Sequence, residues 1–238
     1  MFFLPIRPEL CCMSSPSLSP THVGIMVSHQ DSQRLPFSIA ESDSQSTLLY
    51  GAFSASSNVR FSLSGGLQRR SFEGVEPIGL IEDLRINAQW LHTNQRLSWS
   101  MQSKLPNTSD SKLGATDETD WSSMISFHTP HPQHRLQIGA GLAIWGDPNR
   151  FASQDDALLF LGQYSFILKQ LQLDIAIGGH ALSPQNPSQT SMILGGAFGD
   201  CRVFKTAGNV GLTPYAPRFG LSITAEYQPK ACTSQKGD

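Results

Sequence analysis

The sequence RLQIGAGLAIWGD, residues Arg135–Asp147, alternates between aliphatic and small or polar side chains. One set is Leu136, Ile138, Ala140, Leu142 and Ile144, and the other is Arg135, Gln137, Gly139, Gly141 and Ala143. A period of two predicts a β-strand with two unlike faces. The aliphatic face either packs on a second sheet in a soluble sandwich or faces hydrocarbon in a membrane barrel, whose polar face then lines a lumen.

The same period recurs from about residue 47 onward, and no segment has the pattern of an amphipathic helix. It predicts about ten to twelve strands, most of them about eight to twelve residues long. The alternating apolar sets include Leu84, Ile86, Ala88 and Trp90, then Leu97, Trp99 and Met101, then Met124 and Ser126, then Ala157, Leu159 and Leu161, and finally Phe219, Leu221, Ile223, Ala225 and Tyr227.

Strand length and loop length favour the membrane barrel over the sandwich. Strands of soluble sheets average about five or six residues, whereas a tilted membrane-spanning strand needs about nine to eleven. Tight turns alternate with longer polar stretches, such as Pro106–Asp120, Gly146–Asp156 and Ser183–Thr190. Because transmembrane barrels have short turns at one rim and long loops at the other, we predict a single antiparallel transmembrane β-barrel with its apolar face toward lipid.

With that orientation, the polar set of each strand faces the lumen. The lumen-facing candidates are Arg85, Asn87, Gln89, Gln102, Arg135, Gln137, Lys169, Asp174, Thr224 and Glu226. Both charge signs occur among them, which suits a barrel lumen and is costly in a dry sandwich core. Of these, Arg85, Arg135, Lys169, Asp174 and Glu226 are expected to set charge selectivity.

Three regions are expected along the chain. Residues 1–46 are rich in Ser and Pro and are expected to be irregular, residues 47–228 to form the barrel, and residues 229–238 to form a polar tail. The start, MFFLPIRPELCC, has no apolar segment of signal-peptide length and no clear cleavage site, so a truncated or mis-started export segment is one interpretation of it.

Composition excludes several other classes of protein. Charged residues make up 15% of the chain and the net charge is -2, which gives no electrostatic case for binding nucleic acid. The longest apolar run is five residues, Ala157–Leu161, so no transmembrane helix is expected. Cys11, Cys12, Cys201 and Cys232 lack the spacing of a zinc site. We expect no cofactor and no metal.

Part of the sequence resembles a known group of proteins. The segments DLRINAQW, RLSWSMQSKLPNTSDSKLGATDETDW and HRLQIGAGLAIWGDP resemble Gram-negative outer-membrane β-barrels described as outer-membrane proteins or transporters, which include the phenol-degradation (meta-pathway) barrel family. The matching loop positions are Leu105, Pro106, Asp110, Leu113, Gly114, Asp117 and Asp120, while Asn107-Thr108-Ser109 replaces Thr-Gly and Thr116 replaces a glycine. The resemblance covers roughly residues 48–228 and implies an outer-membrane barrel more firmly than a substrate.

Three clusters invite a chemical interpretation. His128, His131 and His134 are evenly spaced, but Pro130 and Pro132 prevent a regular helix, and a turn between strands is expected instead. Asp117, Glu118 and Asp120 lack the spacing of a calcium loop and are expected to be a solvated acidic loop.

The third cluster concerns hydrolysis. His92 or His180 could meet one of the many serines, as in outer-membrane lipid hydrolases, but no G-x-S-x-G motif marks a nucleophile. We therefore expect no enzymatic activity.

These observations predict a passive pore or transporter of the Gram-negative outer membrane. Its expected partners are membrane lipid and a small apolar or amphiphilic solute, with no nucleic acid, and the sequence leaves the oligomeric state and the solute open. Two alternatives remain: a soluble β-barrel or sandwich that binds a hydrophobic ligand, and an outer-membrane lipid hydrolase.

Overall fold

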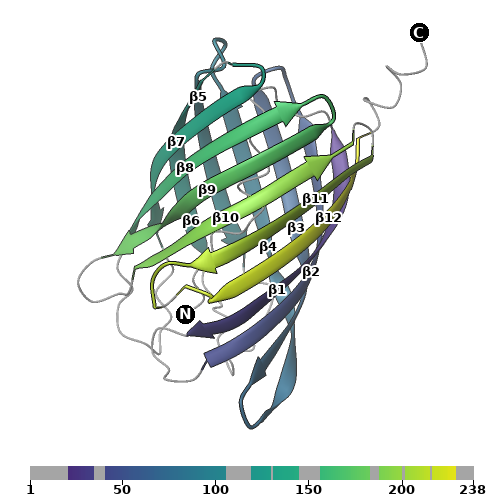
Figure 1. Cartoon of the computed structure of the whole chain (residues 1–238), viewed down its shortest axis with the longest axis vertical. Coiled ribbons are helices and arrows are strands. Elements are labelled where there is room, and N and C mark those ends of the chain that lie inside the picture. The colour runs from purple at the N-terminus through teal and green to yellow at the C-terminus, as the bar shows by residue number, and fades with distance from the viewer. Residues whose placement is uncertain are drawn as a thin grey trace.

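The structure, a computed structural model, is a closed barrel of twelve antiparallel strands, as the sequence predicts (Figure 1). It describes residues 21–34, 41–105, 119–129, 131–144, 156–182, 188–199, 202–214 and 216–228. The strands are β1 (His22–Arg34), β2 (Glu41–Ser54), β3 (Val59–Phe72), β4 (Val75–Leu91), β5 (Leu97–Leu105), β6 (Asp120–His128), β7 (His134–Ile144), β8 (Ala157–Leu168), β9 (Leu171–Leu182), β10 (Gln189–Phe198), β11 (Arg202–Gly211) and β12 (Phe219–Tyr227).

Each strand pairs with its neighbours in sequence, and β1 closes the barrel by pairing with β12. The closing register runs without a shift from Val23 opposite Tyr227 to Asp31 opposite Phe219. Full closure leaves no open sheet edge, which is the condition that a sheet must meet to sit in a bilayer.

The two rims differ in the length of the chain that connects their strands. At one rim, here called the short-turn rim, the connections are residues 55–58, 92–96, 129–133, 169–170 and 199–201. At the other, the long-loop rim, they are residues 35–40, 73–74, 106–119, 145–156, 183–188 and 212–218. In bacterial outer-membrane barrels the short turns face the periplasm and the long loops face outward.

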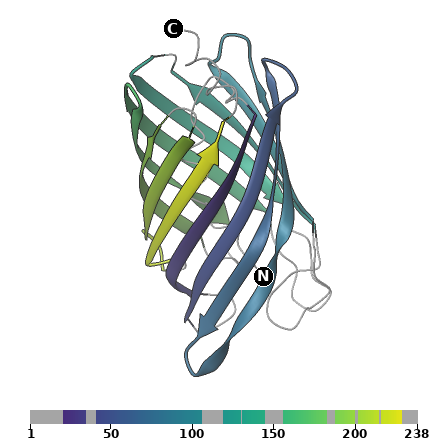
Figure 2. The same ribbon diagram turned by 90° about the vertical axis from the view of Figure 1, so that its right-hand side faces the viewer.

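The β3–β4 hairpin is the exception at the long-loop rim. Its turn is only residues 73–74, with Gly74 in the left-handed region at φ 74° as a tight hairpin requires. The two strands are long instead, at 14 and 17 residues, and they project beyond the other strands (Figures 1 and 2).

The barrel begins earlier in the chain than expected. Strand β1 and the first part of β2 lie within residues 1–46, which the sequence analysis assigns to an irregular segment. In β2, the outward positions toward the long-loop rim are the polar residues Asp43, Gln45 and Thr47, so the apolar alternation is missing from this half of the strand. Residues 1–20 and 229–238 lie outside the described residues.

The outer surface of the barrel is apolar, as predicted for a membrane barrel. In β7, Leu136, Ile138, Leu142 and Ile144 are exposed, and Ile138 is 57% exposed. Aromatic side chains gather on the outer surface near the short-turn rim, namely Phe53, Phe61, Trp90, Trp99, Phe127, Phe198, Phe204 and Tyr227. An apolar band edged by aromatic side chains is typical of transmembrane barrels.

Two strands have the opposite orientation to the one expected. In β8, Ala157 and Leu161 are buried inside, while Leu158 is 60% exposed. The first half of this strand is apolar on both faces, so alternation there could not orient it. In β6, Met124 and Ser126 are predicted on the apolar outer face, but Ile125 and Phe127 are the exposed residues and Ser126 is buried.

Within the part of the chain that the structure describes, no helix is both long enough and apolar enough to cross a bilayer.

Candidate functional site

The inner face of the barrel carries most of the polar residues that the sequence analysis placed there. Asp174, Thr224 and Glu226 are buried, and Arg85, Asn87, Gln89, Gln102, Arg135 and Gln137 are half-buried. Each alternates with exposed or half-buried side chains of the outer surface. They come from five strands, β4, β5, β7, β9 and β12.

Lys169 has a different position from the other candidates. It is exposed in the tight turn between β8 and β9, and its φ of 52° is left-handed. Such a backbone conformation belongs to a turn residue, so Lys169 lies at the short-turn rim and outside the barrel wall.

A network of charged side chains lies near the short-turn rim where β1 closes on β12. Lys205 Nζ donates to Glu226 Oε1 at 2.5 Å, and the hydroxyl of Tyr50 donates to the same oxygen. Beside them, Arg60 Nη2 lies 2.9 Å from His22 Nε2. Because the Glu226 side chain is only 3% exposed, its charge is held by these partners more than by water. We call these five residues the short-turn network.

Asp174 extends the polar wall of this rim. Gln172 Nε2 donates to Asp174 Oδ1 at 2.9 Å and to Oδ2 at 3.0 Å, and Gln163 Nε2 donates to Oδ1 at 3.2 Å. Lys205 and Arg135 also act on the Asp174 carboxylate electrostatically. The carboxylate is therefore held by two amide side chains and attracted by cations on β7 and β11.

A second network lies toward the long-loop rim on β4, β5 and β6. Lys104 Nζ lies 2.7 Å from Asp120 Oδ2 and 3.7 Å from Asp83 Oδ2. Arg85 Nη2 lies 3.9 Å from Glu82 Oε2. Lys104 and Asp120 are 4% and 5% exposed, so this ion pair is enclosed. We call these five residues the long-loop network.

Apolar side chains occupy part of the inner face at mid-height, where Thr224 lies opposite Met26 and Ser222 opposite Ala207. Leu161, Ala176, Ile193 and Ala207 form one buried cluster with Met124 packed against it, and Met26 and Leu48 are buried opposite each other on β1 and β2. On β9, Ala176 lies between Asp174 and His180. On β11, Ala207 lies between Lys205 and Asn209. We call these seven apolar residues the apolar constriction.

The constriction is tightly packed. Leu48 is 2% exposed and Ile193 is 1% exposed. A barrel of about eight strands is filled by side chains, whereas one of 16–18 strands leaves an aqueous channel. A barrel of twelve strands lies between these two cases.

The histidines flanking the β6–β7 turn divide between the two surfaces. His128 is buried on the inner face, whereas His131 and His134 are exposed, with their rings 5.2 Å apart. Among the described residues, no three His, Cys, Asp or Glu side chains group as metal ligands. Of the acidic loop, Asp120 belongs to the long-loop network, while residues 117 and 118 lie outside the described residues.

A serine and a histidine do meet inside the barrel, although not the histidines that the sequence analysis considered. Ser98 Oγ lies 2.7 Å from His128 Nε2, and both residues are buried. The charge that acts on His128 is the guanidinium of Arg135, whereas a hydrolytic triad places a carboxylate or amide there. His180 is buried on β9, and His92 lies in the β4–β5 turn.

Most members of the two networks were not singled out from the sequence. His22 and Tyr50 belong to β1 and β2, where the run of apolar residues at alternate outward positions is short. For Lys205 a signal existed, because it alternates with Phe204 and Thr206 in the order expected of an inward residue. The pairing of partners across strands depends on register, which alternation does not give.

No protein-family model matches the sequence. No curated protein matches it either.

Solved structures do match. An outer membrane channel from Pseudomonas putida F1 superposes with a TM-score of 0.68 at 11% identity, over 88% of this chain and 95% of that one. The translocator domain of the autotransporter NalP from Neisseria meningitidis gives 0.49 at 8% identity, over 88% of each chain. A FadL homologue of Pseudomonas aeruginosa gives 0.46 at 7% identity, over 89% of this chain and 91% of that one.

The Pseudomonas putida channel matches almost end to end, and its similarity to this chain is one of fold. Together with the closed sheet and the apolar outer surface, it establishes the architecture. The chain has the fold of an outer-membrane channel β-barrel.

Proposed function

We propose that this chain is a narrow passive channel of the Gram-negative outer membrane that admits small apolar or amphiphilic solutes. The observation that carries the proposal is the order of groups along the inner face. Charged networks lie near the two rims, and the apolar constriction lies between these levels on β1, β2, β6 and β8–β11, with Leu48, Leu161 and Ile193 almost fully buried.

This order favours apolar over ionic solutes. An ion that entered at either rim would have to give up its hydration to cross the constriction, which costs several kcal/mol without a compensating partner. An apolar solute instead exchanges water for contacts with leucine, isoleucine and methionine side chains. Passage needs these side chains to change rotamer, which exposed apolar side chains do within nanoseconds and packed ones more slowly.

The soluble alternative is the weaker one. Large apolar side chains are exposed around the barrel, including Leu49 at 64% and Leu158 at 60%. Monomeric soluble proteins rarely expose contiguous apolar patches above a few hundred Å². A ligand-binding barrel in water would therefore have this surface unfavourably exposed.

The test measures uptake of a small apolar fluorophore, N-phenylnaphthylamine, by intact Gram-negative cells producing the full chain. We expect uptake several-fold faster than in cells without the protein, and faster still with Ile193→Ala, which opens the constriction. A polar antibiotic too large for the lumen, vancomycin, reports a general leak. The proposal would be contradicted if cells with and without the protein took up the fluorophore at the same rate. It would also be contradicted if the protein made cells sensitive to vancomycin to the same extent as it raised fluorophore uptake.

A further inference from the structure

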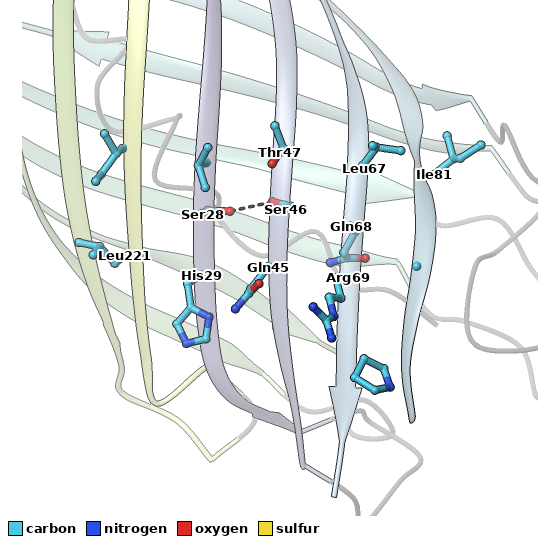
Figure 3. A pocket seen from close by; sticks show the side chains of 14 residues that line it. Ser28, His29, Gln45, Ser46, Thr47, Leu67, Gln68, Arg69, Ile81 and Leu221 are labelled. Atoms are coloured by element: carbon cyan, nitrogen blue, oxygen red, sulfur yellow. Dashed lines mark hydrogen bonds between the residues drawn. The ribbon is translucent and has the colours of Figure 1, made fainter. Parts of the chain in front are cut away.

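A hollow of about 850 Å³ lies on the outer surface of the barrel, over β12, β1, β2, β3 and β4 (Figure 3). It lies near the long-loop rim, beside the projecting β3–β4 hairpin. It is separate from the lumen because most of its lining side chains belong to the outward-facing set.

The lining consists of two rows set by the strand register. The first row is Ile223, Val27, Thr47, Leu67 and Ile81, each opposite the next on the neighbouring strand. The second row, one step nearer the long-loop rim, is Leu221, His29, Gln45, Arg69 and Gly79. The first row is apolar except for Thr47, whereas the centre of the second row is polar.

Three polar side chains of the second row lie next to one another on β1, β2 and β3, as Figure 3 shows for His29, Gln45 and Arg69. Arg69 is exposed and forms no ion pair with any residue that the structure describes. The Nδ1 atom of His29 is buried and has no hydrogen-bond partner among those residues. The guanidinium N–H groups of Arg69 are therefore available to an acceptor on a bound molecule.

Gly79 keeps the hollow open on the β4 side. A Cβ atom built at this position would meet nothing within 4 Å. Asp31 and Asp43 lie two residues beyond His29 and Gln45, on the side away from the first row, and they do not line the hollow. The formal charge within the lining is thus that of Arg69.

We propose that this hollow binds the phosphate-bearing headgroup of a lipid in the outer leaflet. The apolar row would contact an acyl chain, and the polar row lies at the depth where headgroups begin. Guanidinium groups bind phosphate through paired hydrogen bonds, and basic sites on membrane proteins recognise lipid headgroups in this way. This inference depends on the barrel lying in a membrane, as in the proposed function, but not on transport through it.

The experiment uses the purified full chain, refolded in detergent micelles, and measures binding of diphosphoryl lipid A by native mass spectrometry. Dephosphorylated lipid A and inorganic phosphate are the comparison probes. We expect the phosphorylated lipid to bind at least roughly tenfold more tightly than the dephosphorylated lipid, the ratio that corresponds to one charge-assisted hydrogen bond. We expect no saturable binding of inorganic phosphate.

Two variants change the hollow and one serves as control. Arg69→Gln removes the charge and is expected to weaken binding roughly tenfold. Gly79→Leu fills open space without a backbone clash and is expected to abolish binding. Arg202→Gln removes an exposed arginine at the opposite rim and should leave binding unchanged.

Folding of each variant is checked by the shift in gel mobility on heating that folded barrels show. Equal binding of the two lipids, or wild-type affinity in folded Arg69→Gln, would overturn the inference. Uptake of the apolar fluorophore by cells should be unchanged in Arg69→Gln, so the failure of this inference is distinguishable from the failure of the proposed channel.

Discussion

Lys205 Nζ lies 2.5 Å from Glu226 Oε1 on the inner face of the barrel, where β11 and β12 approach the closing strand β1. Tyr50 reaches the same carboxylate from β2, on the far side of β1. One carboxylate thus connects three strands at the seam where the first strand meets the last.

Removing one member of this pair should destabilise the barrel more than removing both. Breaking a buried ion pair lowers the free energy of unfolding by about 3–5 kcal/mol because a charge is left without its partner. About half of that loss is expected here, because Lys205 is 16% exposed and water screens its charge. We expect Lys205→Met and Glu226→Gln each to be less stable than the double variant. Urea unfolding in lipid vesicles measures this, and additive single effects would contradict the coupling.

Gly24 makes this contact possible. It lies opposite both Tyr50 and Glu226 in the register, and a Cβ atom there would collide with the Tyr50 ring and with the carbonyl oxygen of Ala225. Gly24→Ala should therefore displace Tyr50 from Glu226 and lower the free energy of unfolding by about 1–3 kcal/mol.

Gly51 provides the matched control, because a Cβ atom there meets its nearest neighbour at an ordinary 3.8 Å. Gly51→Ala should change the stability by less than about 0.5 kcal/mol. If the two variants were equally stable in urea titrations, the packing of Tyr50 over Gly24 would not matter for closure.

The two faces of β7 should respond differently to a new charge. Ile138 is 57% exposed on the outer surface, and an arginine near the bilayer midplane costs about 2–4 kcal/mol. Gln137 is its half-buried inward neighbour. We expect Ile138→Arg to reduce the yield of folded protein in vesicles sharply and Gln137→Arg to reduce it little. The reverse order would mean that the apolar face does not meet lipid.

The Ser98–His128 contact tests the hydrolase alternative. We expect the refolded protein to release no fatty acid from phospholipid vesicles and to resist a serine-directed fluorophosphonate, because Arg135 rather than a carboxylate acts on His128. Ser98→Ala should cost about 1 kcal/mol of stability, the value of one hydrogen bond. Labelling that disappears in Ser98→Ala would instead identify an activated nucleophile.

Where the inner and outer faces differ strongly, the sequence predicted the structure well. In β7 the outward residues are aliphatic and the inward ones are small or polar, so alternation gave both the strand and its orientation. In β8, Leu161 faces an apolar part of the lumen, so both faces of the first half of the strand are apolar, and the predicted orientation was wrong.

The first half of β2 was missed for a related reason, whereas in β1 the exposed residues Val23, Ile25 and Val27 do alternate and indicate a strand that was not predicted. The outward residues Asp43 and Gln45 of β2 lie toward the long-loop rim, where the apolar band has ended. Outside hydrocarbon, a strand has no need of apolar outward residues, and the pattern that identifies it disappears. The partners in the networks could not be predicted because they depend on register, as in the diagonal contact of Lys205 with Glu226.

The claim on which the account depends is that the apolar outer surface meets lipid, and fractionation of Gram-negative cells producing the full chain tests it most directly. We predict that the protein is recovered with outer membranes, is released only by detergent, and migrates faster on a detergent gel before boiling than after. Recovery in the soluble fraction without detergent, with no change in mobility on heating, would contradict it.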